Sequence, residues 1–600
     1  MEQVKTRDEI EDIYKWDLTK VFKNNKEFNS FYDETKELIE DYPKYQNKVM
    51  SSANKLLESF TAYLEIVRRV EKLYSYANML SDQDVSNNTN QELLGRVMNL
   101  YELANKNTYF MRTEIIKESN QLKQYYKDNP KLLDYELVIK DIVRYKKYTL
   151  SDIEEKLLSE TTKALGNNDS TYSFLTSSDM SFDNIKDENN NEVELTDTNY
   201  SIFIKSKDRR VRRDAFYKLY EQYKQYSNTL SSTLNGHIKE NVTLSHIRGY
   251  NSAFARSVFS DELDENVYKT LVDTVHENLD VYQKYFKLKK KILKLDDMNL
   301  YDVYVEMIKD YNKEYSFDDA KDLIFKALKP LGEDYLKDLE RPFKERWIDI
   351  YPNKNKRGGA YSGGSYDTYP YVLLNYQNRI DDVSTIIHEL GHSMHSYYTR
   401  TNQPFQYGDY PIFVAEVAST TNELLLARYL IENSTDPNEK LSALNHLLEL
   451  FKATIYRQVM FEEFELYAYD LVEQDDVITS DKLCNKYLEL NKLYFGNSLN
   501  VNEEIKYEWE KVPHFYYNFY VYKYATSLSA ASIITTKILE GDTKIRDKYL
   551  EMLKSGSTKS PLDTLKIVGI DMTQKEVYKS AIDMFDKTID EFEKVMKEVN

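Results

Sequence analysis

The chain has 600 residues, of which 41% are hydrophobic, so it is long enough to bury a large core. Its formal net charge of -19 disfavours nucleic acid and anionic lipid as partners, because an acidic surface repels both. The single cysteine, Cys484, excludes an internal disulfide framework and a cysteine-rich metal site. The charged N-terminal sequence lacks a secretory apolar core, and no apolar run approaches the length of a membrane span. These features predict a cytoplasmic protein without a membrane partner.

The first predicted elements are long helices between residues 29 and 166. Apolar and aromatic residues recur there three and four positions apart, as they do along one face of an amphipathic helix. An example is the series Leu56, Phe60, Tyr63, Leu64 and Val67. The sequence then changes at residues 180–195 to two short alternating stretches around an asparagine-rich centre, which predicts a β-hairpin. Helical periodicity resumes near residue 197.

Residues 356–377, KRGGAYSGGSYDTYPYVLLNYQ, form the one segment rich in glycine and tyrosine. The glycines predict a loop that is mobile or closely approached, and the apolar run at residues 371–376 is typical of a strand. Two interpretations of this strand are open. It is either an ordinary edge strand or a strand whose unpaired backbone groups bind an extended peptide.

The segment at residues 381–400, DDVSTIIHELGHSMHSYYTR, carries the clearest chemical pattern. His388 and His392 are four positions apart, so on a helix their imidazoles project from one face and converge on one metal. Zinc in such a site lowers the pKa of a bound water, and Glu389 stands where a carboxylate takes the proton and passes it to the leaving amine. Gly391 costs about 1 kcal/mol relative to alanine inside a helix, so we expect another backbone or a ligand close by. His395, one turn further on, is expected to line the site.

Zinc needs a third protein ligand while one position stays open. A new helix is predicted after Pro411, with Glu416 in its first turn among apolar neighbours. A carboxylate in such surroundings needs a partner, and a metal held by the histidine helix would provide it. Glu423 lies two turns further along and is the rival candidate. The alternative for the whole pattern is a chance helix surface with two solvated histidines.

A hydrolytic site must also stabilise the negative oxygen that develops on the attacked carbonyl. Residues 513–526, PHFYYNFYVYKYAT, offer His514 and a dense group of tyrosine hydroxyls as donors. The alternative interpretation is a tyrosine-rich helix that serves only for packing.

Taken together, HELGHSMH, FVAEVAST and the glycine-rich segment resemble the M3 family of zinc metallopeptidases and, within it, the oligoendopeptidase F branch. The resemblance extends over nearly the whole chain, through KWDLTKVF, SKDRRVRRDAF and ATIYRQVMFEEFE. It implies one Zn²⁺ per chain on His388, His392 and Glu416, with Glu389 as the general base.

The resemblance also implies roles for two further groups of residues. His514 and the tyrosines after it correspond to a stretch that contacts substrate and transition state. Their spacing differs from that of the thimet oligopeptidase relatives, so Tyr522 and Tyr520 are both first choices for the acting hydroxyl, with Tyr522 assigned the catalytic role. The implied substrate-binding residues are Tyr517, Tyr520, Tyr524, Gly359, Ala360 and Tyr361, the last three as part of a channel wall along which the peptide backbone pairs.

The resulting fold prediction is a mostly α, two-lobed, zincin-type metallopeptidase with a deep central channel and a small β-sheet beside the active-site helix. Residues 1–200 are expected to form an N-terminal helical lobe with a terminal β-hairpin, and residues 201–600 the catalytic domain. The predicted function is endopeptidase cleavage of short oligopeptides by a metal-activated water. One rival is a helical zinc carboxypeptidase, which would bind the substrate carboxylate with a residue such as Arg357, Lys356 or Arg457. The other is a non-catalytic peptide-binding scaffold.

Overall fold

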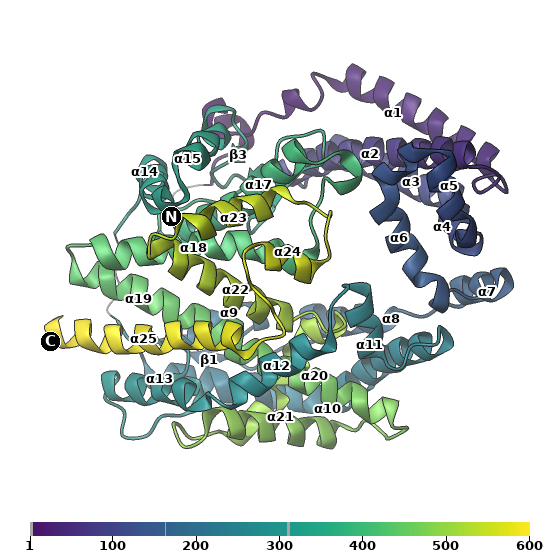
Figure 1. Cartoon of the computed structure of the whole chain (residues 1–600). Helices are drawn as coiled ribbons and strands as arrows, with labels where there is room; N and C mark the ends of the chain where they lie inside the picture. Colours follow the sequence, from purple (N-terminus) through teal and green to yellow (C-terminus); the bar gives the residue numbers. More distant parts are fainter. Residues whose placement is uncertain (1–3, 163, 309–312, 600) are drawn as a thin grey trace. The chain divides into compact units, whose positions relative to one another are not determined.

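The computed structural model describes residues 4–162, 164–308 and 313–599, and helices make up most of it (Figure 1). The chain divides into two compact units, each assembled from three separate stretches of sequence. Unit 1 comprises residues 1–147, 312–426 and 534–569, and unit 2 comprises residues 148–311, 427–533 and 570–600. The mostly α class predicted from the helical periodicity is confirmed.

Unit 1 contains the first six helices, the larger sheet and the helix with the two histidines. Its elements are α1 (Asn25–Asp41), α2 (Ala53–Gln83), α3 (Asn88–Thr108), α4 (Phe110–Lys117), α5 (Leu122–Asp128), α6 (Glu136–Arg144), α14 (Phe317–Ala327), α15 (Glu333–Leu339), α16 (Arg341–Lys344), β3 (Ile348–Asp349), β4 (Tyr361–Gly363), β5 (Tyr371–Leu373), α17 (Ile380–Asn402), α23 (Thr543–Lys554) and α24 (Pro561–Ile567).

Unit 2 contains the longest helix, α10, and the small hairpin. Its elements are α7 (Asp152–Thr162), α8 (Asn167–Phe174), β1 (Ile185–Lys186), β2 (Glu192–Val193), α9 (Asp197–Phe203), α10 (Arg209–Ile247), α11 (Ala253–Ser260), α12 (Glu265–His276), α13 (Leu279–Ile292), α19 (Pro437–Phe451), α20 (Arg457–Glu473), α21 (Ser480–Phe495) and α25 (Lys575–Val599). Helices α18 (Ile412–Asn433) and α22 (Tyr522–Leu539) contribute residues to both units.

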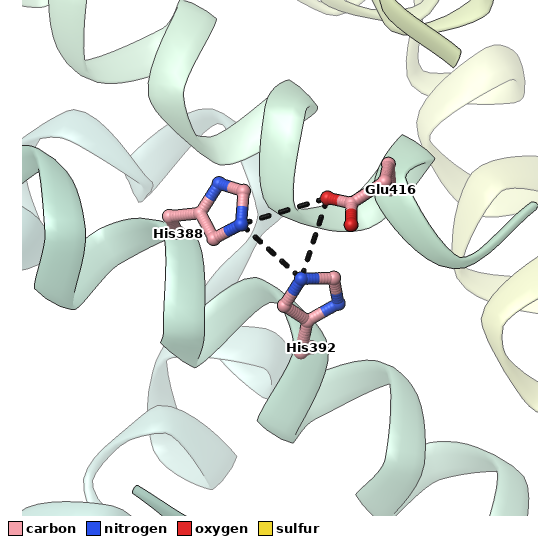
Figure 2. A group of neighbouring side chains, drawn as sticks. All are labelled: His388, His392 and Glu416. Atoms are coloured by element: carbon pink, nitrogen blue, oxygen red, sulfur yellow. Dashed lines mark hydrogen bonds and ion pairs between the residues drawn. The ribbon is translucent and has the colours of Figure 1, made fainter. Parts of the chain in front are cut away.

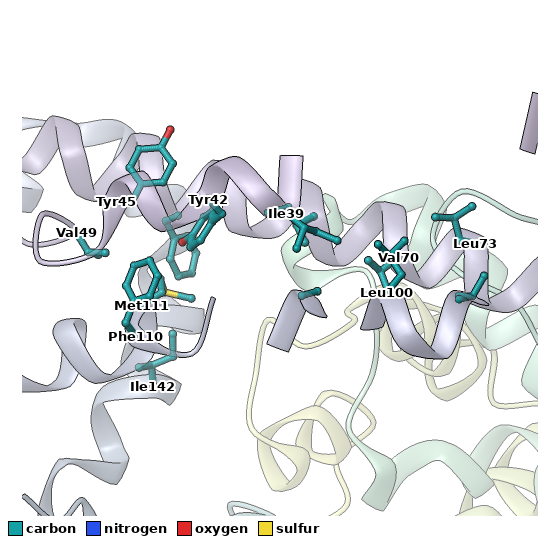
Figure 3. Close-up of a cluster of buried hydrophobic side chains, with 14 of the residues drawn as sticks. Ile39, Tyr42, Tyr45, Val49, Val70, Leu73, Leu100, Phe110, Met111 and Ile142 are labelled. Atoms are coloured by element: carbon teal, nitrogen blue, oxygen red, sulfur yellow. The ribbon is translucent and has the colours of Figure 1, made fainter. Parts of the chain in front are cut away.

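The core of the N-terminal helices follows from the spacing seen in the sequence. Leu56 and Phe60 of α2 are fully buried, and Val70 and Leu73 continue the same apolar stripe toward Leu100 of α3 (Figure 3). Burying each such side chain contributes about 1.5–3 kcal/mol. The start of α2 is fixed by Ser52, whose hydroxyl accepts a hydrogen bond from the backbone N–H of Lys55.

Both predicted strand regions form strands. The hairpin is confirmed, because β1 and β2 pair antiparallel with Ile185 opposite Val193. In unit 1, β5 pairs parallel with β3 and antiparallel with β4, so the strand order is β3-β5-β4. Both interpretations of residues 371–376 placed an open edge there, and both are wrong for these residues, because β5 is paired on its two sides. Strands β3 and β4 form the two edges of the sheet. The open edge of β4, which begins at Tyr361, is on the side of the sheet order opposite β3, and helix α17 packs against β4 and β5.

Within the described residues, no helix is both long enough and apolar enough to span a bilayer.

Candidate metal centre

The metal centre is built where helices α17 and α18 cross within unit 1. The N-terminus of α17 is capped by Asp382. Its carboxylate accepts hydrogen bonds from the backbone N–H groups of Gln377 and Arg379, each at 2.9 Å. The crossing is closest at Gly391. A Cβ atom there would lie 2.5 Å from the Cα of Ser419 and 2.8 Å from the carbonyl oxygen of Ala418. The predicted close backbone approach at Gly391 is confirmed, because only glycine leaves room for α18.

Three ligand atoms converge at this crossing. His388 and His392 project from adjacent turns of α17, and Glu416 faces them from the first turn of α18 (Figure 2). The two Nε2 atoms lie 3.2 Å apart, and Oε2 of Glu416 lies 3.5 Å from that of His388 and 3.4 Å from that of His392. Ligands placed about 2.0–2.1 Å from a tetrahedral zinc ion are separated by about 3.3–3.4 Å. The cluster therefore has the donor types and spacing of three corners of such a site.

Glu423, the rival for the third ligand, lies on the other side of the His388 ring. Its Oε1 is 2.5 Å from Nδ1 of His388. In the neutral ring, an Nδ1–H that donates to this carboxylate leaves the Nε2 lone pair directed at the cluster, which is the tautomer that binds a metal. Burial lowers the pKa of His388, but Glu423, followed by the carboxylates of Glu389 and Glu416, outweighs it and raises the value to about 9. The site thus attracts positive charge at its centre.

The Glu416 carboxylate is held ready for a cation. Its Oε2 accepts a hydrogen bond of 2.9 Å from the hydroxyl of Ser419, one turn along α18. Burial acts to raise the pKa of Glu416, but His392 and His388 outweigh burial and bring the value to about 2. Glu416 therefore stays ionised at all ordinary pH values. Its carboxylate is an anionic ligand for a cation, whereas the two imidazoles are neutral ligands.

Glu389 adjoins the cluster and also contacts the edge of the sheet. It is buried, and its carboxylate accepts a hydrogen bond from the backbone of Ser362 in β4. The hydroxyl of Ser362 lies 2.8 Å from that of Ser393 on α17, which fixes this strand against the helix. Burial raises the pKa of Glu389, while His388 and His392 oppose the rise. A carboxylate tuned upward in this way is a better proton acceptor than a solvated one.

The structure adds residues that the sequence did not single out. Tyr410 stacks on His395 with ring centroids 3.6 Å apart, and its hydroxyl lies 3.2 Å from that of Ser396. His395 is 1% exposed and lies against this ring. Asn422 of α18 donates to the carbonyl oxygen of Ile387 at 3.2 Å and so ties the two helices together. The sequence held one signal for the contact of Glu423 with the site. Glu416 and Glu423 are seven residues apart and therefore share a helix face.

The second predicted group, around His514, lies in unit 2. His514 belongs to a 3₁₀ helix (Pro513–Tyr516), and burial lowers its pKa. The following turn contains Asn518 and Phe519 in the left-handed region, with φ of 53° and 62°. Such a conformation needs support in residues other than glycine. Helix α20 supplies it, since Glu465 accepts from the N–H of Phe519 at 2.8 Å and the Tyr469 hydroxyl donates to the Asn518 side chain at 2.8 Å.

The tyrosines of this segment differ in exposure. Tyr517 is 56% exposed, Tyr520 and Tyr524 are half-buried, and Tyr522 is 1% exposed with its ring packed edge-on against Tyr268. Of the predicted substrate-binding residues in unit 1, Gly359 and Ala360 directly precede β4 and Tyr361 is its first residue. Tyr361 donates its hydroxyl to Asp82 at 2.8 Å, so its backbone is the part available along the edge.

The basic residues considered for a carboxypeptidase are largely engaged elsewhere. The side chain of Lys356 is buried and forms an ion pair of 2.7 Å with Asp349. Arg457 forms an ion pair of 2.9 Å with Glu508 within unit 2. Arg357 is the most exposed of the three, at 57% of its side chain. A buried ion pair of this kind is a structural element, because removing either partner leaves an uncompensated charge.

Comparison with known proteins decides the family. The model of peptidase family M3 matches residues 202–584, and the model described as oligopeptidase F matches residues 118–182. The chain is 40% identical to oligopeptidase PepF of Bacillus subtilis over 598 residues, which cover 100% of this chain and 89% of that protein. The chain belongs to peptidase family M3.

Two further relatives agree with this family. The chain is 37% identical to an oligoendopeptidase F homologue of Lactococcus lactis, with 99% of each chain covered. The crystal structure of oligoendopeptidase-F from Enterococcus faecium superposes with a TM-score of 0.75 at 33% identity, covering 96% of this chain and 99% of that one. This family M3 chain is thus a metallopeptidase that hydrolyses peptide bonds, and the interpretations as a carboxypeptidase or as a non-catalytic scaffold are not favoured.

Proposed function

We propose that this family M3 peptidase is a zinc endopeptidase that cleaves internal bonds of short oligopeptides. The observation that carries the proposal is the arrangement of His388, His392 and Glu416, whose mutual distances of 3.2–3.5 Å suit one tetrahedral ion with an open position. The names of the relatives, oligopeptidase and oligoendopeptidase F, support short peptides as substrates. The reducing cytoplasm is the proposed location, in keeping with a single cysteine, Cys484.

In the proposed reaction, bound zinc would act as a Lewis acid that lowers the pKa of water in the site. Glu389 accepts the proton from the attacking water and returns it to the leaving amine, since its carboxylate adjoins the cluster and its pKa is raised by burial. Glu423 keeps the His388 ring in the metal-binding tautomer throughout.

We assign substrate positioning to the open edge of β4. Residues 359–361 lead into this edge, and an extended peptide that pairs with it would lie beside α17. Contact with the developing oxyanion is assigned to His514 and to one tyrosine of the same segment. Of the two first choices, Tyr520 is favoured over Tyr522, because Tyr522 is 1% exposed.

The test of this function is the Glu389→Gln variant. It should bind one equivalent of zinc like the wild type and lose at least about a thousandfold in kcat, because the amide cannot accept the proton. Asp381→Asn, which changes an exposed acid in the first turn of the same helix, is the matched control and should keep its activity. Turnover is measured with an internally quenched peptide that is amidated at its C-terminus, and products are identified by mass spectrometry. Near wild-type turnover in Glu389→Gln, or release of only the C-terminal residue, would overturn the proposal.

A further inference from the structure

A cavity lies in unit 1, next to the open edge of the sheet. It is a pocket of about 510 Å³ with walls from α2, from β4 and the turn after it, and from the C-terminal part of α17 and the segment that follows. Tyr361 and Gly363 of β4 belong to its lining. A peptide that paired along β4 would therefore reach this pocket at one end of the strand.

The most unusual group in the pocket is Arg400. Its Nη2 donates to the carbonyl oxygen of Gly364 at 3.3 Å, whereas its buried Nη1 has no hydrogen-bond partner in the part of the chain that the structure describes. In the same described part, no carboxylate lies within ion-pair distance of the guanidinium. Burial lowers the pKa of Arg400, which reflects the cost of holding this charge away from water. Buried charges in native proteins are normally paired in direct contact, and among the described residues this guanidinium has no carboxylate in contact with it.

The position of Arg400 relative to the metal centre follows from the helix that carries both. Arg400 comes eight residues after His392 on α17. At 1.5 Å per residue, this is roughly 12 Å along the helix axis. An extended peptide advances about 3.3 Å per residue, so the same distance corresponds to roughly four peptide residues.

We propose that Arg400 forms a subsite that binds a carboxylate of the substrate, about four residues from the cleaved bond. This inference rests on the proposed endopeptidase function and adds a specificity determinant to it. The carboxylate is either the side chain of an acidic residue or the free C-terminus of the peptide, since both present the same pair of oxygens to a guanidinium.

Two acidic residues tune this subsite. Glu71 and Asp409 line the same pocket and interact electrostatically with Arg400. Asp409 and the ionised form of Glu71 weaken the attraction of the pocket for negative charge, and burial together with Asp409 raises the pKa of Glu71 to about 7. Removing the charge of Glu71 should therefore strengthen the preference for an acidic substrate, whereas a pocket built for a cationic side chain would respond in the opposite direction.

The experiment uses the zinc-loaded enzyme and a series of quenched peptides. Glu is compared with Gln at the third, fourth and fifth positions on either side of the cleaved bond, and each peptide is made with a free and with an amidated C-terminus. For the wild type, kcat/KM of the peptide with the carboxylate should exceed that of the matched amide peptide by about tenfold to a hundredfold at one position in the series. Faster cleavage of the free than of the amidated peptides, whether they carry Glu or Gln, identifies the terminal carboxylate as the group bound. Faster cleavage of the Glu than of the Gln peptides, whatever the C-terminus, identifies an acidic side chain.

Variants assign the preference to the pocket. Arg400→Gln should reduce the acid-to-neutral ratio to about one, and Arg379→Gln, which changes an exposed arginine just before the same helix, should leave the ratio unchanged. Glu71→Gln should raise the ratio, and it keeps the test decisive if Arg400→Gln does not fold. A wild type that cleaves all peptides with equal efficiency, or an Arg400→Gln enzyme that keeps the preference, would overturn the subsite. Failure of the wild type to cleave any peptide would instead overturn the proposed function.

Discussion

Replacing Gly391 with alanine tests whether the crossing of α17 and α18 sets the metal geometry. The new Cβ would stand 2.5 Å from the Cα of Ser419 and 2.7 Å from its backbone nitrogen. Carbon atoms in contact prefer about 3.5–4.0 Å, so the helices must separate by about 1 Å. Overpacking of this kind costs about 1–3 kcal/mol, and the better helix propensity of alanine offsets about 1 kcal/mol of it.

The larger effect of Gly391→Ala is expected on metal binding. Metal–ligand distances tolerate only about 0.2 Å, so a 1 Å shift of α18 moves Glu416 out of reach of an ion held by the two histidines. Zinc affinity should fall by at least about tenfold, measured by competition with a chromogenic chelator.

The matched control for this change is Gly95→Ala. Gly95 also lies inside a helix, α3, but nothing lies within 4 Å of the position of its Cβ. This variant should raise the free energy of unfolding by up to about 1 kcal/mol and leave zinc affinity unchanged. A Gly391→Ala enzyme that binds zinc as tightly as the wild type would refute the argument that the helix crossing positions Glu416.

Substitutions at Glu423, Asp349 and Glu465 test the ligand orientation, a buried ion pair and the turn after His514. Glu423→Ala should weaken zinc binding about 10–100-fold by releasing the His388 ring, and unchanged affinity in the chelator competition would contradict that role. Asp349→Asn should lower the free energy of unfolding in urea by about 3–5 kcal/mol at pH 7, because it leaves Lys356 buried without a counter-charge. Burial opposes ionisation of Asp349, but Arg7 and Lys356 outweigh burial and keep its pKa below the unfolded value of about 3.9. The stabilisation by the Asp349 charge is therefore present above the unfolded pKa and is lost as pH falls through the folded pKa. A difference that persists in acid would argue against the ion pair. Glu465→Leu should reduce kcat/KM about tenfold at unchanged zinc content, since the turn after His514 loses a hydrogen-bond acceptor, whereas Glu465→Gln keeps an acceptor and should stay within a few-fold of the wild type.

Short-range patterns in the sequence were sufficient to predict the helices and the two histidines of the metal site. The periodicity at Leu56 and Phe60 placed both residues in the core of the N-terminal helices, where they are fully buried. The spacing of His388 and His392 needs only the geometry of one helix to place both rings on one face. Gly391 added long-range information, because a glycine inside a helix predicted the close approach of a second backbone, which is α18.

Features that depend on distant pairing were beyond sequence reasoning. Strand β5 is central because Val372 pairs with Ile348 of β3, a strand of two residues that is too short to leave a pattern. The interleaving of three stretches in each unit likewise has no local signature. The division at residue 200 into an N-terminal lobe and a catalytic domain stays a prediction.

The unpaired state of Arg400 was not foreseen, because it depends on which side chains surround a position, and periodicity carries no such information. The same limit applies to Tyr522, whose burial against Tyr268 comes from a residue far away in sequence. The roles of His514 and its neighbouring tyrosines stay predictions.

Titration of the metal-free enzyme with zinc, followed by metal analysis and by peptide hydrolysis on the same samples, tests the central claim most directly. The wild type should reach full activity at one equivalent, and Glu416→Ala should lose tight binding and activity together. Retention of one tightly bound zinc and wild-type turnover by Glu416→Ala would show that the ion is held elsewhere and would contradict the account.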